Sequence, residues 1–173
     1  MVMNVTAALS DRIIETIPAG SVFLELGSGK GTRKLVEHFD VYTVEHDPQY
    51  VGSVPGAKYI HAPLRPVPHN AAWKRFPALT EWYDVDVLRR ELPKSYAAVL
   101  VDGPPNSFRR AGFYVYYSLF DPTAVVFLDD VGRENESRML RLFAQDLKIP
   151  QVTIYDSHQR HSWSMLDPKD GIR

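Results

Sequence analysis

A glycine-rich turn directly after a short apolar run constrains the fold of this chain more than any other feature. Residues 22–26 read VFLEL, and residues 27–32 continue as GSGKGT. An apolar run of this length indicates a buried parallel strand, and glycines at alternate positions let a ligand approach the backbone closely. The helix expected after the turn would point its free N–H groups at a carboxylate or a phosphate.

The spacing of this turn distinguishes several kinds of ligand. A nicotinamide-binding loop has a glycine where this chain has Thr32, and a Walker phosphate loop has serine or threonine where this chain has Gly31. Glu45 ends a second apolar run, 18 residues after Gly27. An acid at that place can hydrogen-bond both ribose hydroxyls of a nucleoside. The pattern therefore departs from both phosphate-binding loops and keeps an acid suited to a nucleoside.

Strand-like and helix-like patterns alternate along the chain. Apolar runs predict strands at residues 22–26, 41–44, 58–60, 97–101, 124–128, 152–155 and 162–166. Apolar positions at helical spacing predict helices at residues 5–17, 32–39, 85–92, 112–120 and 134–147. This order predicts an α/β fold, with a mostly parallel, Rossmann-like sheet and helices on both faces. The last two strands lie so close in sequence that they should form an antiparallel hairpin.

Residues 62–93 differ from the rest of the chain because they are rich in proline and tryptophan. A connection of this length in a compact domain is usually functional. We interpret residues 62–93 as a lid or a substrate-side insertion within a single domain, residues 1–173. Trp82 and Tyr83 would contact the substrate, because aromatic side chains pack well against rings and sugars. Alternatively, these side chains only cover an edge of the sheet.

The sequence E-x-G-x-G-x-G at residues 25–31 resembles motif I of the class I S-adenosylmethionine (SAM)-dependent methyltransferases. Residues 97–105 (AAVLVDGPP) resemble the fourth motif of that family, and residues 125–131 (VVFLDDV) resemble its next strand. The resemblance extends over nearly the whole chain. It implies a seven-stranded sheet with an antiparallel C-terminal strand, and an enzyme that transfers a methyl group from SAM.

The same resemblance implies which residues bind the cofactor. The glycine turn would hold the methionine part of SAM, Glu25 would lie near its ammonium group, and Glu45 would bind the ribose. Ala62 stands where the family often has an acid, so backbone and apolar contacts would hold the adenine. The residues expected to bind SAM are Glu25, Gly27, Ser28, Gly29, Gly31, Glu45, His46, Ala62 and Asp102.

Three aspartates at predicted strand ends are the expected catalytic residues. Asp102 follows one strand, and Asp129 and Asp130 follow the next, so their carboxylates should converge at one edge of the sheet. Converging carboxylates repel one another, and Mg²⁺ or Ca²⁺ would remove that repulsion. The three residues resemble the metal triad of catechol and sugar O-methyltransferases, in which the metal binds a substrate hydroxyl. Alternatively, Asp129 caps a turn and Asp102 only orients the cofactor.

Arginines near the same strand ends provide a second way to neutralise the aspartates. Arg109 and Arg133 are expected to bind an acidic group of the substrate, or, with Arg110, to pair with the aspartates. His158 and His161 flank the predicted hairpin turn, where histidines are usually exposed.

The composition limits the partners of the chain. Its 20 basic and 21 acidic residues give a net charge of −1, so no general positive field favours nucleic acid or membrane. The chain has no cysteine, which excludes disulfides and cysteine-bound zinc. No signal peptide is recognisable, and no apolar run approaches the roughly 20 residues that span a bilayer. We therefore expect a cytoplasmic protein with a small-molecule substrate.

Methyl transfer from SAM to a hydroxyl oxygen of a small molecule is the leading functional hypothesis. The alternatives are a metal-independent methyltransferase that acts on a nitrogen or on a protein, and a SAM-binding protein without transferase activity. A short-chain dehydrogenase is disfavoured, because Tyr114, Tyr116 and Tyr117 are not followed by a lysine four residues later. Neither the methyl acceptor nor the oligomeric state follows from the sequence.

Overall fold

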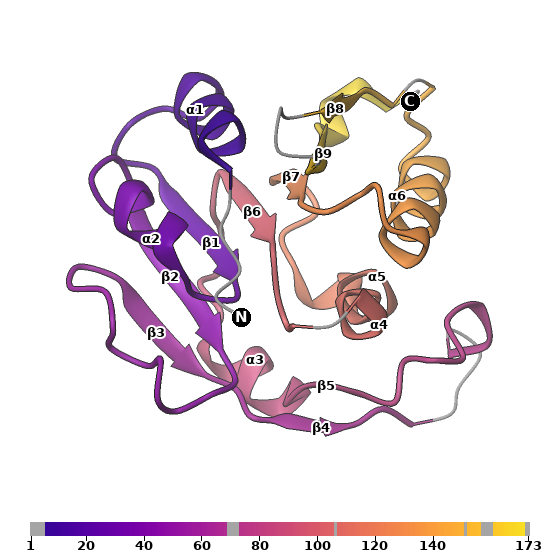
Figure 1. Cartoon of the computed structure of the whole chain (residues 1–173), viewed down its shortest axis with the longest axis horizontal. Coiled ribbons are helices and arrows are strands. Elements are labelled where there is room, and N and C mark those ends of the chain that lie inside the picture. Colours follow the sequence, from indigo (N-terminus) through magenta and orange to yellow (C-terminus); the bar gives the residue numbers. More distant parts are fainter. Residues whose placement is uncertain (1–5, 69–72, 106, 151, 157–160, 172–173) are drawn as a thin grey trace.

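The computed structural model describes residues 6–68, 73–105, 107–150, 152–156 and 161–171. Within these residues, one seven-stranded sheet has the order β3-β2-β1-β6-β7-β9-β8 (Figure 1). Its strands are β1 (Val22–Leu26), β2 (Asp40–Glu45), β3 (Lys58–His61), β6 (Ala98–Val101), β7 (Val125–Leu128), β8 (Ile154–Asp156) and β9 (Ser162–Leu166). Neighbouring strands are parallel except for β9, which is antiparallel to both β7 and β8. The predicted α/β fold with its closing hairpin is therefore confirmed.

Helices cover both faces of the sheet, as predicted. They are α1 (Ala7–Thr16), α2 (Lys30–Leu35), α3 (Val85–Glu91), α4 (Ser107–Arg110), α5 (Gly112–Val115) and α6 (Glu134–Asp146), with 3-10 turns η1 (Trp73–Arg75), η2 (Tyr117–Leu119) and η3 (Pro168–Asp170). Leu9 of α1 and Leu35 of α2 pack with Phe23 of β1 in one buried cluster. Leu24, the next residue of β1, belongs to a second cluster with Phe143 of α6. Successive strand residues point to opposite faces, so each face has its own core.

The register of the sheet aligns the carboxyl ends of four strands. Leu26 at the end of β1 pairs with Val44 of β2 and Val101 of β6, and Val101 pairs with Leu128 of β7. The residues that follow these strands therefore share one rim, where ligands bind in open α/β sheets. The glycine turn and the three predicted aspartates all belong to this rim.

The boundaries of two predicted helices are wrong. The helix predicted from residue 112 onward ends at Val115, where η2 follows. Residues 113–117 read FYVYY, and aromatic and β-branched side chains have low helix propensity. The helix predicted at residues 32–39 begins at Lys30 and ends at Leu35, so the glycine turn runs directly into it. Among the described residues, no helix is long and apolar enough to cross a membrane.

The long connection after β3 contains an antiparallel ribbon that the sequence did not predict, followed by the predicted helix α3. The ribbon pairs β4 (Leu64–Pro66) with β5 (Glu81–Tyr83) (Figure 1). Trp82 and Tyr83 are each 1% exposed and belong to the core cluster that includes α6. Trp82 stacks on Tyr116 with ring centroids 5.1 Å apart. These side chains anchor the ribbon in the core.

Candidate functional site

A cavity of about 260 Å³ opens at the rim where β1, β2 and β6 end. Six of the residues expected to bind SAM line it: Gly27, Ser28, Gly29, Glu45, His46 and Asp102. The other three, Glu25, Gly31 and Ala62, are buried and do not line the cavity. The rim therefore brings most of the predicted cofactor residues around one space.

The glycine turn after β1 touches the turn after β6. Gly27 has a φ of +92°, in the left-handed region that favours glycine. A β-carbon added to Gly27 would lie 2.9 Å from the Cα of Gly103, and one added to Gly103 would lie 2.7 Å from the Cα of Gly27. Glycine at both positions is therefore required for the two turns to meet and form one wall of the cavity.

Glu25 supports the glycine turn from inside the fold. The Thr32 hydroxyl donates to Oε2 of Glu25 at 2.7 Å and accepts from the N–H of Gly29 at 2.9 Å. Burial raises the pKa of Glu25 to about 8, and repulsion from Asp102 and Glu45 adds to the shift, although the Thr32 bond opposes it. Glu25 therefore keeps its proton at neutral pH and orders the turn through Thr32.

The raised pKa of Glu25 predicts a loss of stability as pH rises. A carboxyl that binds its proton more tightly in the folded chain stabilises the fold below its unfolded pKa, and this contribution disappears as pH rises through the folded value of about 8. One pKa unit is about 1.4 kcal/mol, so a shift from 4.5 to about 8 lowers the free energy of unfolding by up to about 4 kcal/mol between roughly pH 5 and pH 8.5. Urea unfolding across this range measures the change. Glu25→Gln should reduce the slope and leave the part that comes from Asp102, whose pKa is also raised, and an unchanged slope in that variant would contradict the assignment.

Glu45 accepts four hydrogen bonds at the end of β2. Its Oε1 accepts from the N–H groups of His46 at 2.7 Å and Asp47 at 2.8 Å. Its Oε2 accepts from the N–H of Ser28 at 3.1 Å and from the Ser28 hydroxyl at 2.9 Å. Burial opposes ionisation, but the His46 side chain, whose Nδ1 lies 2.8 Å from Oε1, and these bonds outweigh it and lower the pKa of Glu45 to about 2. Glu45 is therefore ionised at neutral pH and ties β2 to the glycine turn.

The structure brings the three predicted aspartates together. One oxygen from each of Asp102, Asp129 and Asp130 lies within 4.8 Å of the others, and all three side chains are buried. Burial raises the pKa of Asp102 to about 7; the charge of Arg110 opposes this shift, and repulsion from the other two aspartates adds to it. Burial and the charge of Asp130 also raise the pKa of Asp129. The cluster therefore needs positive charge or protons to persist.

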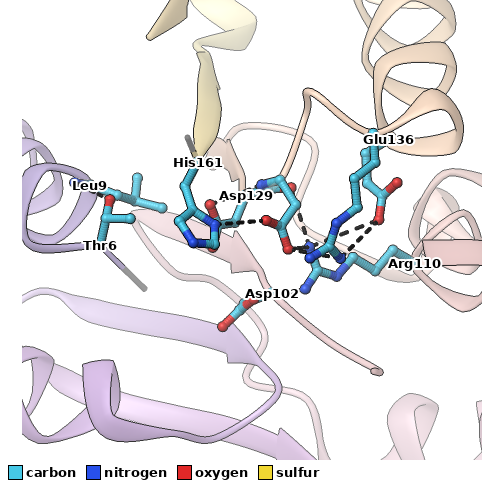
Figure 2. A network of polar contacts seen from close by, with 9 residues as sticks. Thr6, Leu9, Asp102, Arg110, Asp129, Glu136 and His161 are labelled. Carbon is cyan, nitrogen blue, oxygen red and sulfur yellow. Dashed lines mark hydrogen bonds and ion pairs between the residues drawn. The ribbon is translucent and has the colours of Figure 1, made fainter. Parts of the chain in front are cut away.

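Arg110 of α4 provides positive charge inside this acid cluster (Figure 2). Its Nη2 donates to Oδ1 of Asp102 at 2.9 Å, and its Nη1 donates to Oδ2 of Asp130 at 2.8 Å. The Arg110 side chain is fully buried, and a fourth buried acid, Glu136 of α6, lies 4.0 Å from Nη1. A planar guanidinium suits this position, because its several N–H groups bind carboxylates in fixed directions.

Two further residues contact Asp130. Nη1 of Arg133 lies 3.0 Å from Oδ2 of Asp130, and Nδ1 of His161 lies 3.2 Å from Oδ1. Burial opposes ionisation of Asp130, but the neighbouring charges of Arg110 and Arg133 and the His161 bond together lower its pKa. Both oxygens of Asp130 are thus engaged by protein groups. His158, the other histidine of the predicted turn, lies outside the described residues.

The two neighbouring arginines of α4 have different partners. Arg109 pairs with Glu81 of β5 and donates to the carbonyl of Pro105 at 3.3 Å, outside the acid cluster. Consecutive helical residues point about 100° apart, so only one of the two can face the aspartates. Arg110 is therefore the residue that organises the cluster, whereas the sequence pointed to Arg109 and Arg133 as the substrate-binding pair.

Comparison with solved structures identifies the fold. An rRNA methylase from Streptococcus thermophilus aligns with a TM-score of 0.58 at 11% identity, over 96% of this chain and 98% of that chain. A methyltransferase-like protein from Silicibacter pomeroyi aligns with a TM-score of 0.58 at 18% identity, over 95% of this chain and 88% of that chain. This is the class I methyltransferase fold. No protein-family model and no curated protein matches the sequence, so the likeness is one of structure.

The class I methyltransferase fold is also shared with a larger enzyme. The MycE methyltransferase of the mycinamycin biosynthetic pathway, solved with Mg, S-adenosylhomocysteine (SAH) and mycinamycin VI, aligns with a TM-score of 0.53 at 13% identity. The alignment covers 97% of this chain and 51% of MycE, so the chain spans about half the length of that enzyme.

Proposed function

We propose that the chain binds SAM in the rim cavity and transfers its methyl group to a hydroxyl oxygen of a small molecule. The contact between Gly27 and Gly103 carries the cofactor part of this proposal, because it places the glycine turn, Glu45 and Asp102 around one cavity. Ligands of open α/β sheets bind at this edge. The solved methyltransferases of the same fold, among them MycE with its bound SAH, support the choice of cofactor.

The residues around the cavity fit SAM in charge and in backbone shape. Bound SAM would supply an electrophilic methyl group on a positively charged sulfonium. Glu45 and Asp102 line the cavity, so acidic groups would face this cation. The glycine turn leaves its backbone open to a close approach by the methionine part of the ligand. Holding acceptor and cofactor side by side would then accelerate transfer through proximity and orientation.

Replacing Glu45 with glutamine is expected to weaken the binding of SAH. The amide cannot accept hydrogen bonds at both ends, and leaving polar partners unpaired costs about 1–3 kcal/mol. This loss corresponds to a dissociation constant about 5- to 150-fold larger. Isothermal titration calorimetry measures the change. Glu15→Gln is the control, because the Glu15 side chain is 68% exposed on α1, and it should bind SAH like the wild type. Wild-type affinity in Glu45→Gln would rule out this role for Glu45.

We propose that the acceptor binds on the side of the acid cluster. A second cavity there is lined by Asp130, Arg133 and His161. The Arg133 side chain is 46% exposed, so its guanidinium is accessible to an acidic group of the acceptor. The role of residues 62–93 as a lid or a substrate-side insertion stays a prediction. Trp82 and Tyr83, which were expected to contact the substrate, are buried in the core.

The contacts of the acid cluster favour a methyltransferase that needs no metal ion. Three carboxylates are a donor set that Mg²⁺ or Ca²⁺ would accept. However, Asp130 already uses one oxygen for Arg110 and Arg133 and the other for His161. A cation that binds all three aspartates would have to displace these groups. The arginines therefore support the metal-independent form of the proposed reaction.

Divalent cations are therefore expected to leave the thermal stability of the chain unchanged. A cation that binds only the folded chain raises the melting temperature by linkage. Thermal unfolding in millimolar Mg²⁺, in Ca²⁺ and in a strong chelator tests for such an effect. A rise in melting temperature with Mg²⁺ that disappears in Asp129→Asn would instead establish a metal site at the cluster.

A further inference from the structure

Two cations of α2 line the rim cavity without an acidic partner. Lys30 and Arg33 both line the cavity, and both residues are exposed. They lie three positions apart in α2, so they share one face of the helix. Among the described residues, neither side chain makes an ion pair or a hydrogen bond, whereas the neighbouring Lys34 pairs with Asp11. The cavity therefore has two uncompensated positive charges on the side of α2.

The two acids that line the same cavity are engaged by other groups. Oε1 of Glu45 accepts from the N–H groups that follow β2, and its Oε2 accepts from Ser28. Oδ1 of Asp102 accepts from Arg110 at 2.9 Å. No other acid among the described residues lines the cavity. The positive charge on α2 is therefore available to a ligand.

The position of the two cations indicates which part of the ligand they would meet. Lys30 directly follows Gly29 of the glycine turn, which would hold the methionine part of SAM. This part carries the one anionic group of SAM, its α-carboxylate. The sulfonium and the ammonium are cations, so Lys30 and Arg33 would repel them and attract the carboxylate. A guanidinium also matches a carboxylate in shape, because the two groups can form paired hydrogen bonds.

We propose that Lys30 and Arg33 bind the α-carboxylate of SAM or SAH and make this group a requirement for tight binding. This inference rests on the proposed function. The pair selects adenosyl ligands that carry a carboxylate and disfavours those that carry an amine alone. An amine without its carboxylate would face two like charges on α2. Lys30 and Arg33 therefore determine the specificity of the cavity for the amino-acid end of the cofactor.

The decarboxylated analogue of SAH isolates the contribution of the carboxylate, because it keeps the adenosine, the thioether and the amine. We expect the wild type to bind SAH about tenfold more tightly than this analogue, the effect of charge-assisted hydrogen bonds to one group. The double variant Lys30→Met/Arg33→Met should bind SAH about tenfold more weakly than the wild type and should no longer prefer SAH. Isothermal titration calorimetry measures the four dissociation constants. The melting temperature of the ligand-free variant should stay level, because both residues are exposed.

Lys34→Met is the matched control. Lys34 follows Arg33 in α2 but pairs with Asp11 and does not line the cavity. This variant should keep the wild-type preference for SAH. A double variant that keeps this preference, or that loses affinity for both ligands equally, would overturn the inference and leave the proposed function intact. Equal binding of the two ligands by the wild type would overturn it as well. Failure of the wild type to bind either SAM or SAH would overturn the proposed function, and the role of the two cations with it.

Discussion

Replacing Arg110 with methionine is expected to lower the free energy of unfolding by about 3–5 kcal/mol, as removing one partner of a buried ion pair does. The Arg110 side chain is fully buried and bridges Asp102 after β6 to Asp130 after β7. Without it, these carboxylates and Glu136 would face one another in the interior with no central positive charge. Urea unfolding followed by circular dichroism measures the loss.

Arg109→Met is the control for this substitution. Arg109 is the preceding residue, and its side chain is 29% exposed where it pairs with Glu81. Exposed ion pairs contribute about 0–1 kcal/mol, so this variant should remain close to the wild type. Adding Asp130→Asn to Arg110→Met should recover part of the lost stability, because one of the uncompensated charges is removed. Equal stability of the two arginine variants would contradict a central role for Arg110.

The substitution Gly27→Ala is expected to destabilise the fold and to abolish measurable binding of SAH. Its φ of +92° costs an L-residue roughly 1–2 kcal/mol. The new β-carbon would also lie 2.9 Å from the Cα and 3.0 Å from the nitrogen of Gly103. Overpacking of this kind adds about 1–3 kcal/mol. The collision would force apart the two turns that form the cavity wall, so binding should suffer more than stability.

Gly20→Ala separates the cost of the left-handed backbone conformation from the cost of the steric collision. Gly20 has a φ of +78°, and apart from Gly20 and its two chain neighbours no atom of the described residues lies within 4 Å of the place that an added β-carbon would occupy. The free energy of unfolding of this variant should fall only by the roughly 1–2 kcal/mol that the left-handed backbone costs, and the variant should bind SAH like the wild type. Thermal unfolding and calorimetry on both variants make the comparison. If Gly27→Ala matched Gly20→Ala in both measurements, the result would contradict the close packing of the two turns at Gly27 and Gly103.

The strands that carry the cavity could be predicted, because a parallel sheet covered on both faces leaves uninterrupted apolar runs in the sequence. The runs at residues 22–26 and 97–101 are of this kind, and both appear as strands. Parallel strands end at a common rim, so the positions of Gly27, Glu45 and Asp102 follow from the same pattern. The backbone topology alone brings these three residues together.

The partners of these acids could not be predicted in the same way. Arg109 and Arg110 are adjacent, and the helix that contains them has only four residues, too few for a periodic pattern. The strands of the ribbon have three residues each, and one of them contains Pro66. The pairing of Leu64 with Tyr83 joins positions far apart in the chain. Which arginine meets the aspartates, and where the Tyr83 side chain packs, depend on tertiary packing.

Calorimetric titration of the wild-type chain with SAM, SAH and NAD⁺ tests the proposed function most directly. The cavity combines a glycine turn that departs from the nicotinamide-binding pattern with the ionised Glu45 and with Asp102. We predict saturable binding of SAM and SAH at one site per chain and no binding of NAD⁺. Saturable binding of NAD⁺ without binding of SAM or SAH would contradict the proposed function.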